Sequence, residues 1–260
     1  GALNNQGELT KLGRRMAEFP TSPELSKMLI ASERYGCTEE CLTIAAMLDV
    51  SNSVFSRPKG KRLHADNAKK HFGRGGHGDH ILLLNCYNEW VEAHRSKAWC
   101  FEHFVQIKSM RKAKDIRTQL RSLCDRVEVD VRSDNSPMPI AKAITAGFFF
   151  NAAKFQKNGT YRTVKSKQVV DIHPSSSLFA PRGGRREAVA AKQQKPPPEM
   201  LVYHELVLTS KEFIRQITPI QEDWLQEIAP HYYQNVGKSK TGMSQTKKVR
   251  MVSGGRAIVQ

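Results

Sequence analysis

Basic side chains recur between residues 108 and 117 at positions that a helix would place on one face. At about 100° per residue, an apolar stripe forms on the opposite face. The stripe contains Met110, Ala113, Ile116, Leu120, Leu123 and Val127, and the other side carries Lys108, Arg111, Lys112, Lys114 and Arg121. Ammonium and guanidinium groups donate hydrogen bonds to phosphate oxygens. The stretch therefore predicts an amphipathic helix that packs through its stripe and offers a polyanion a positive surface.

The charge of the whole chain favours a polyanion as partner. Its 260 residues include 41 Lys and Arg against 25 Asp and Glu, which gives a formal net charge of +16. A charged helical face is often no more than a solvated surface, and this alternative stays open for residues 108–117. The net charge favours RNA or DNA over an acidic protein or a membrane surface.

Three patterns that suggest catalysis or metal binding fail on their spacing. Gly237-Lys238-Ser239 lacks the glycine that a phosphate-binding loop needs five residues earlier. His204 would need a second histidine one helical turn later to form a zinc protease site, but Leu208 stands there. A further group fits no standard zinc spacing: His71, His77 and His80. We expect no metal and no catalytic residue here.

Helical periodicity dominates the first half of the chain. Ser22-Pro23-Glu24 is a typical helix start, with a capping serine, a proline in the first turn and a carboxylate at the positive end. Further helices are predicted over residues 38–48, from Asp79, over 99–106 and through the basic stretch. An irregular basic loop is expected over residues 51–78. These elements predict a helical bundle.

The periodicity changes after Pro137. A helix is predicted over residues 140–154, followed by strand-like segments at 160–164, 169–173, 201–209 and 213–218. Four or five short strands with turns between them indicate a small barrel, so the expected fold class is α+β. Residues 180–199 lack apolar periodicity and are expected to form a flexible inserted loop, and residues 234–260 a basic disordered tail.

Cysteine usage and hydropathy indicate a soluble intracellular protein. The five cysteines are odd in number and scattered, which argues for buried reduced thiols rather than a disulfide framework. No apolar run approaches the ~20 residues that cross a bilayer. The first 20 residues resemble no signal peptide and are too few to fold alone, so we expect the chain to begin inside a domain.

Several motifs, taken together and in this order, resemble the C-terminal half of DEAH-box RNA helicases. They are LGRRMAEFP (12–20), LTIAAML (42–48), VF with RP (54–58), HAD (64–66), GDH (78–80), RKAKDIR (111–117), HPSSSL (173–178) and YHELVLT (203–209). KAITAG (142–147) and APHYY (229–233) are most similar to the spliceosomal branch of the family. The resemblance covers nearly all of residues 1–233.

The resemblance implies a domain order and an activity. It implies the end of a winged helix in residues 1–20, a helical ratchet domain in 21–131 and an oligonucleotide/oligosaccharide-binding (OB) barrel in 132–233. ATP and Mg²⁺ are expected in two RecA-like domains upstream, which this sequence does not contain, so we expect no cofactor and no ATP hydrolysis here. The implied partners are single-stranded RNA, the RecA-like domains, a G-patch activator protein and spliceosomal proteins, in the nucleus.

Eight residues are the candidates for contact with RNA. On the basic helix, Arg111 and Lys112 are predicted to bind phosphates and Ser109 to donate from its hydroxyl. Arg117 lies at the edge of the stripe, where a structural ion pair is as good an interpretation. The barrel candidates are Lys154, Tyr161, Arg162, Thr163 and Lys165. Tyr161 could stack on a base or belong to the core. An alternative function is a docking module that binds a G-patch protein, near residues 9–19, with little RNA contact.

Overall fold

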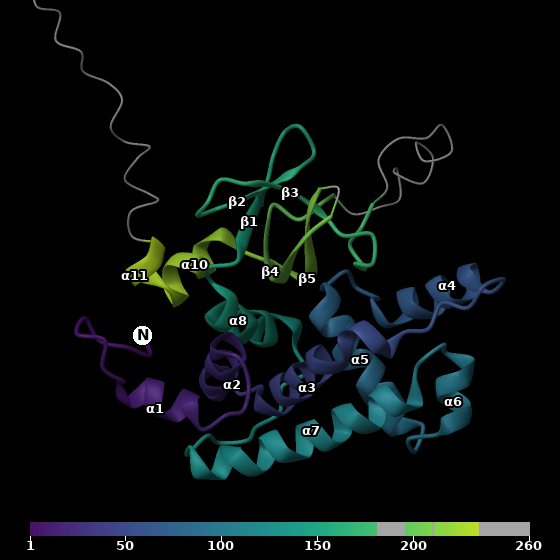
Figure 1. The fold of residues 1–260 in the computed structure, drawn as a ribbon, viewed down its shortest axis with the longest axis horizontal. Coiled ribbons are helices and arrows are strands. Elements are labelled where there is room, and N and C mark those ends of the chain that lie inside the picture. Colours follow the sequence, from purple (N-terminus) through teal and green to yellow (C-terminus); the bar gives the residue numbers. More distant parts are fainter. Residues whose placement is uncertain (181–195, 210, 234–260) are drawn as a thin grey trace, which may run out of the picture.

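The computed structural model describes residues 1–180, 196–209 and 211–233, which form a helical bundle and a small β-barrel beside it (Figure 1). The bundle contains α1 (Lys11–Ala17), α2 (Pro23–Tyr35), α3 (Thr38–Val54), α4 (Arg62–Phe72), α5 (Asp79–Glu92), α6 (Lys97–Glu102), α7 (Ile107–Arg126) and α8 (Pro137–Phe148). The barrel contains β1 (Ala152–Phe155), β2 (Tyr161–Thr163), β3 (Val169–Ile172), β4 (Met200–Leu208) and β5 (Glu212–Ile220). Helices α10 (Glu222–Ile228) and α11 (Pro230–Tyr233) follow. The predicted α+β order, helices and then a barrel, is confirmed.

Local sequence signals set the ends of α2. The Ser22 side chain accepts a hydrogen bond from the backbone N–H of Leu25 at 3.4 Å, and Pro23 occupies the first turn. At the other end Gly36 adopts φ 68°, a left-handed conformation that glycine reaches without steric cost. The predicted start of this helix is confirmed.

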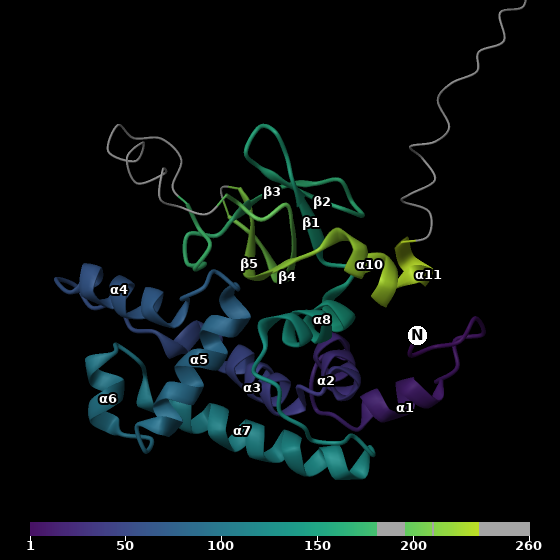
Figure 2. The same cartoon turned by 180° about the vertical axis from the view of Figure 1, so that it is seen from behind.

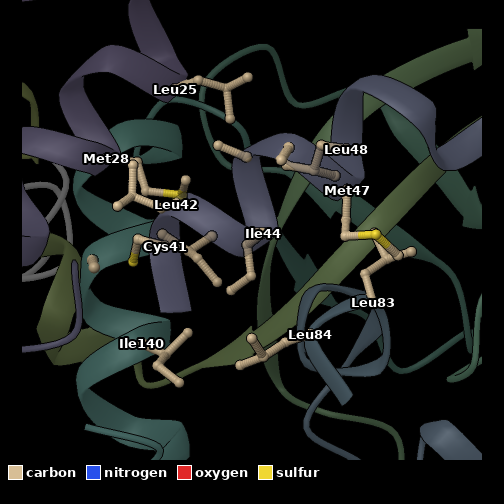
Figure 3. Close-up of a cluster of buried hydrophobic side chains, with 14 of the residues drawn as sticks. Leu25, Met28, Cys41, Leu42, Ile44, Met47, Leu48, Leu83, Leu84 and Ile140 are labelled. Carbon is tan, nitrogen blue, oxygen red and sulfur yellow. The ribbon is translucent and has the colours of Figure 1, made fainter. Parts of the chain in front are cut away.

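Helix α3 lies at the centre of the bundle and packs against α2, α5 and α7. Figure 3 shows its core: Leu42 and Ile44 of α3 lie with Met28, Leu84 and Ile140, which come from α2, α5 and α8. Each of these side chains is at most 3% exposed. Burying a side chain of this size contributes about 1.5–3 kcal/mol. The helices are therefore held chiefly by α3.

The sequence interpretation of residues 51–78 as an irregular loop is wrong. Helix α3 continues to Val54, and α4 occupies residues 62–72. Only Ala65 and Phe72 of α4 are buried, whereas its Leu63 is 71% exposed. Two anchors seven residues apart give too sparse a pattern to show helical periodicity. Phe72 fixes the helix, because its ring packs against Phe55 and Trp99 at centroid distances of 6.2 and 5.8 Å.

The barrel is closed, with its strands in the order β1-β2-β3-β5-β4. Neighbouring strands are antiparallel except β3 and β5, which are parallel. The expected helix over residues 140–154 is wrong at its end, since α8 ends at Phe148 and the chain turns into β1. Ala152 and Ala153 carry little strand propensity. Both are completely buried, in the strand that pairs with β2 on one side and β4 on the other.

The remaining predictions about the fold have mixed outcomes. All five cysteines are free and buried, as predicted. Helices α10 and α11 were not predicted; Trp224 and Tyr233 anchor them in the core. Most of the expected flexible loop, residues 181–195, and the expected tail, residues 234–260, lie outside the described residues.

Candidate nucleic-acid interface

Helix α7 is the amphipathic helix that the sequence predicts. Met110, Ala113 and Leu120 are buried, and α7 packs along α3. Arg111 and Lys112 are exposed in its first two turns. Arg111 makes no hydrogen bond or ion pair with any described residue. Its guanidinium is therefore available to a phosphate.

The first turns of α7 are fixed to the last turns of α3, residues 49–54, which are called the α3 end below. Ser109 is buried and its hydroxyl donates to the Ser53 carbonyl oxygen at 2.8 Å. Lys112 Nζ donates to Asp49 Oδ2 at 2.8 Å, with the two side chains 64% and 48% exposed. Such exposed pairs contribute little, so Lys112 can leave Asp49 for a phosphate at small cost. The RNA-binding role predicted for Ser109 stays a prediction. In the structure its hydroxyl already donates a hydrogen bond within the protein.

The barrel reaches the same α3 end from the other side. Arg215 of β5 donates from Nη2 to Asn52 Oδ1 at 2.5 Å. Its neighbour Gln216 donates from Nε2 to Ser51 Oγ at 2.6 Å. The α3 end therefore contacts both the first turns of α7, through Ser109 and Lys112, and Arg215 of the barrel.

A second positive surface follows the α3 end along the chain. Between residues 57 and 74 there are seven basic residues and one acid, Asp66. The basic residues are Arg57, Lys59, Lys61, Arg62, Lys69, Lys70 and Arg74. Arg57 pairs with Asp66 at 2.7 Å, and Lys61, Arg62 and Lys70 are exposed without an ion pair to a described residue. The high density of basic residues was visible in the sequence, but the helix α4 that exposes part of them was not predicted.

A buried carboxylate locks the bundle to the barrel at the first residue of α5. Asp79 is 7% exposed and accepts four hydrogen bonds from the barrel side. The donors are Ser176 Oγ at 2.7 Å, Ser177 N at 2.7 Å, Ser177 Oγ at 2.8 Å and Ile217 N at 3.0 Å. Gly78, with φ 95°, permits this approach, because a Cβ there would lie 2.3 Å from the Ile217 carbonyl oxygen. These contacts define the bundle–barrel seam.

Two further side chains cross the bundle–barrel seam. His80 is fully buried and its Nδ1 lies 2.7 Å from Thr218 Oγ1. Burial lowers the pKa of His80 to about 3, so its ring is neutral. Lys69 of α4 donates from Nζ to the Ser175 carbonyl oxygen at 2.6 Å. The bundle and barrel therefore meet through a network of polar contacts, in which His80 Nε2, Arg215 Nε and Gln216 Oε1 have no hydrogen-bond partner among the described residues.

The lysines predicted on the barrel face the C-terminal helices. Lys154 Nζ donates to Glu222 Oε2 at 2.6 Å and lies 3.6 Å from Glu199. The hydrogen bond to Glu222 raises the pKa of Lys154. Lys165 Nζ lies 4.4 Å from the centre of the Tyr232 ring, a cation–π contact. Both cations have partners in α10 and α11.

The other barrel candidates divide between the core and the surface. Tyr161 is 2% exposed, and its hydroxyl donates to the Pro198 carbonyl oxygen at 2.8 Å. Thr163 is 4% exposed and its Oγ1 accepts from the Gln168 N–H at 2.9 Å. Arg162, between them on β2, is exposed and makes no hydrogen bond or ion pair with a described residue. Of these three, only Arg162 offers a ligand a free donor.

The structure does not bring the two predicted groups together. Helix α7 and strand β2 lie at opposite edges of the molecule, with α2, α3 and α8 between them (Figure 1, Figure 2). The α3 end, which Lys112 contacts from α7, is instead contacted by Arg215 and Gln216 of β5. Arg117 forms the structural ion pair that was the alternative, with Glu39, and its Nε donates to Thr43 Oγ1 at 2.8 Å.

Models of three protein domains match the chain. Residues 1–21 match the winged-helix part of the helicase associated domain (HA2), and residues 22–83 match its ratchet-like part. Residues 140–233 match an oligonucleotide/oligosaccharide-binding (OB) fold. This set of domains is typical of the C-terminal region of DEAH/RHA helicases.

The helicase-associated and OB-fold domains correspond to the bundle and barrel described above. Their seam lies at Asp79, and Lys61, Arg62 and Lys70 lie within the residues that match the ratchet-like domain. Within the described ranges, no three His, Cys, Asp or Glu side chains are grouped so that they could hold a metal ion. No helix in the described part of the chain is long and apolar enough to span a membrane.

Proposed function

We propose that the ratchet-like and OB-fold domains hold single-stranded RNA by its backbone, as accessory domains of a DEAH-box-type ATP-dependent RNA helicase. The observation that carries the proposal is the set of exposed cations on α7 and at α4, which comprises Arg111, Lys61, Arg62 and Lys70. Phosphate contacts of this kind are independent of sequence. They suit an enzyme that moves along its strand.

The barrel supports the same proposal. OB-folds commonly bind oligonucleotides on the face of strands 2 and 3 and with the loops after strands 1 and 4. Arg162 lies exposed on β2, and Lys167 lies exposed in the β2–β3 turn. Lys157 adds a further exposed cation after β1. To contact these barrel side chains as well, an RNA strand bound at the α3 end would have to run past the bundle–barrel seam.

The finer proposal is a role in pre-mRNA splicing in the nucleus, with domain boundaries at residues 20/21 and 131/132. The similarity of residues 142–147 and 229–233 to the spliceosomal branch supports it. RecA-like domains in the same helicase would bind ATP and Mg²⁺, and spliceosomal proteins would be its neighbours. In this proposal the chain itself supplies grip and no chemistry.

Fluorescence anisotropy with labelled single-stranded RNA tests the proposal. We expect binding at low salt to RNAs of unrelated sequence, with similar affinities and a steep fall as salt rises. Affinity that depends on one sequence, or no binding at low salt, would contradict backbone grip.

A second candidate function is docking of a G-patch protein. Leu3 and Leu9, in the part that matches the winged helix, are 57% and 48% exposed. A G-patch peptide could cover them. Titration of the chain with such a peptide, beside the RNA titration, separates the two functions: saturable peptide binding without RNA binding would favour docking.

A further inference from the structure

A small cavity opens at the bundle–barrel seam. Its volume is about 50 Å³, and its polar lining residues are Ser51, Lys69, Asp79, Ser175, Arg215 and Gln216. A water molecule needs ~10–15 Å³ of such volume. The cavity can therefore accept a group with several oxygen atoms, such as a phosphate.

Two cations on the cavity wall have hydrogen-bonding capacity to spare. Arg215 Nε is buried and has no hydrogen-bond partner among the described residues. Lys69 has three N–H donors and gives one to the Ser175 carbonyl oxygen. Burial lowers the pKa of Lys69, which means that its charge is poorly solvated. An anion in the cavity would satisfy both groups.

The cavity also presents an acceptor. Ser51 donates its hydroxyl hydrogen to the Leu48 carbonyl oxygen at 2.8 Å, so Ser51 Oγ can only accept from Gln216. This assigns Nε2, and not Oε1, of the Gln216 amide to the contact with Ser51, so Oε1 points away from Ser51. Gln216 Oε1 is buried without a hydrogen-bond partner in the described part of the chain. A ligand that fits here must therefore offer a donor as well as an anion.

The backbone of Gln216 is unusual for a strand. Its φ is 49°, in the left-handed region that side chains other than glycine seldom occupy. Such a conformation costs of order 1–3 kcal/mol and clusters at functional sites. It points the Gln216 amide to Ser51, and the Ile217 N–H donates to Asp79.

Nearby carboxylates leave the cations available. Asp79 already accepts four hydrogen bonds. Glu205 lies 3.5 Å from Arg215 Nη1, and the side chains of Arg215 and Glu205 are 22% and 44% exposed. This contact leaves Arg215 Nε without a partner among the described residues.

We propose that this cavity receives the phosphate and the ribose 2′-hydroxyl of one nucleotide of single-stranded RNA. The phosphate lies between Lys69 and Arg215, and the 2′-hydroxyl donates to Gln216 Oε1. The inference rests on the proposed RNA grip and adds a means of telling RNA from DNA, since the 2′-hydroxyl is the group that distinguishes them.

The first experiment leaves the protein unchanged. Oligouridine, oligodeoxyuridine and 2′-O-methyl oligouridine of equal length are titrated against the chain by fluorescence anisotropy. We expect about two- to tenfold tighter binding of oligouridine than of the other two, because neither a 2′-methoxy group nor a deoxyribose can donate the buried hydrogen bond to Gln216 Oε1. Equal affinities would overturn the proposal.

The second experiment compares variants. Gln216→Met removes the acceptor at similar size and should bring the affinities for RNA and DNA together while leaving the salt dependence unchanged. Lys69→Gln should weaken RNA binding at least tenfold, because it removes a charged hydrogen-bond donor to the phosphate. The matched control is Lys97→Gln, which removes the same charge from an exposed position on α6.

The outcomes separate this inference from the function on which it rests. If the unchanged chain binds no RNA, the proposed function fails. If it binds RNA but Lys69→Gln behaves as Lys97→Gln does, or folded Gln216→Met keeps the preference for RNA, only the ribonucleotide site fails. Circular dichroism of each variant establishes that it is folded.

Discussion

The carboxylate of Asp79 accepts hydrogen bonds from both the backbone N–H and the hydroxyl of Ser177, at 2.7 and 2.8 Å. These residues lie 98 positions apart, in the bundle and in the barrel. The pair makes the two domains depend on each other for stability, because neither domain alone satisfies the buried groups.

Asp79→Ala should lower the free energy of unfolding by about 3 kcal/mol. The change leaves buried donors without a partner, and each such group costs about 1–3 kcal/mol. Urea unfolding followed by circular dichroism measures the loss. Asp115→Ala, at an exposed position on α7, is the control and should change stability by less than ~0.5 kcal/mol. Equal effects of the two changes would show that Asp79 does not lock the seam.

Stability should fall as the pH drops from about 6.5 toward 3. Burial holds the pKa of His80 at about 3 in the folded protein, below the ordinary value of 6.5. The unfolded chain therefore binds more protons in this window, and His80 alone gives a slope of about 1.4 kcal/mol per pH unit. His173 and His204, whose pKa values are also lowered by burial, add to it.

His80→Gln isolates this contribution. The slope of unfolding free energy against pH, measured with urea, should become smaller in this variant. His64→Gln, at an exposed histidine, should leave the slope as it is. An unchanged slope in His80→Gln would contradict the role of burial at the seam.

Asp49→Asn should tighten RNA binding a few-fold. The change frees Lys112 from its partner and removes a negative charge from the proposed RNA path. Anisotropy titrations at several salt concentrations measure the effect, which should shrink as salt rises because exposed charges are screened. Weaker binding after the change would show that Asp49 positions Lys112 rather than restrains it.

Substitutions of Arg162 and Lys154 should differ in their effect on RNA binding, although both residues were predicted to contact RNA. Arg162→Gln should weaken RNA binding, since its guanidinium has no partner among the described residues. Lys154→Gln should have the smaller effect on RNA, because the Lys154 ammonium already binds Glu222. A larger loss of RNA affinity in Lys154→Gln than in Arg162→Gln would instead indicate that RNA binds on the α10 side of the barrel.

Patterns that repeat within one element could be predicted from the sequence. The start of α2 follows from Ser22 and Pro23, and the amphipathic face of α7 follows from the spacing of its apolar residues. Helix α4 was missed because two buried residues are too few to show a helical period. Strand β1 was missed because alanine favours helix over strand.

Contacts between distant residues were beyond the reach of the sequence. No spacing rule brings Gln216 to Ser51, 165 positions away, or shows that Gln216 adopts a left-handed backbone. The predictions for the barrel failed in part for the same reason. Basic and hydroxyl side chains in residues 154–165 suggested a ligand surface, but Tyr161 and Thr163 face the core and Lys154 faces Glu222.

The most direct test of the RNA grip is the salt dependence of RNA binding by the double variant Arg111→Gln/Lys112→Gln. Each phosphate contact to a single strand adds about 0.7 to the slope of log affinity against log salt. We predict that the slope of the double variant is smaller by about 1.4 and that affinity falls equally for all sequences. Arg126→Gln, at the other end of α7, controls for charge and should keep the original slope. A double variant with the slope of the unchanged chain would contradict the account.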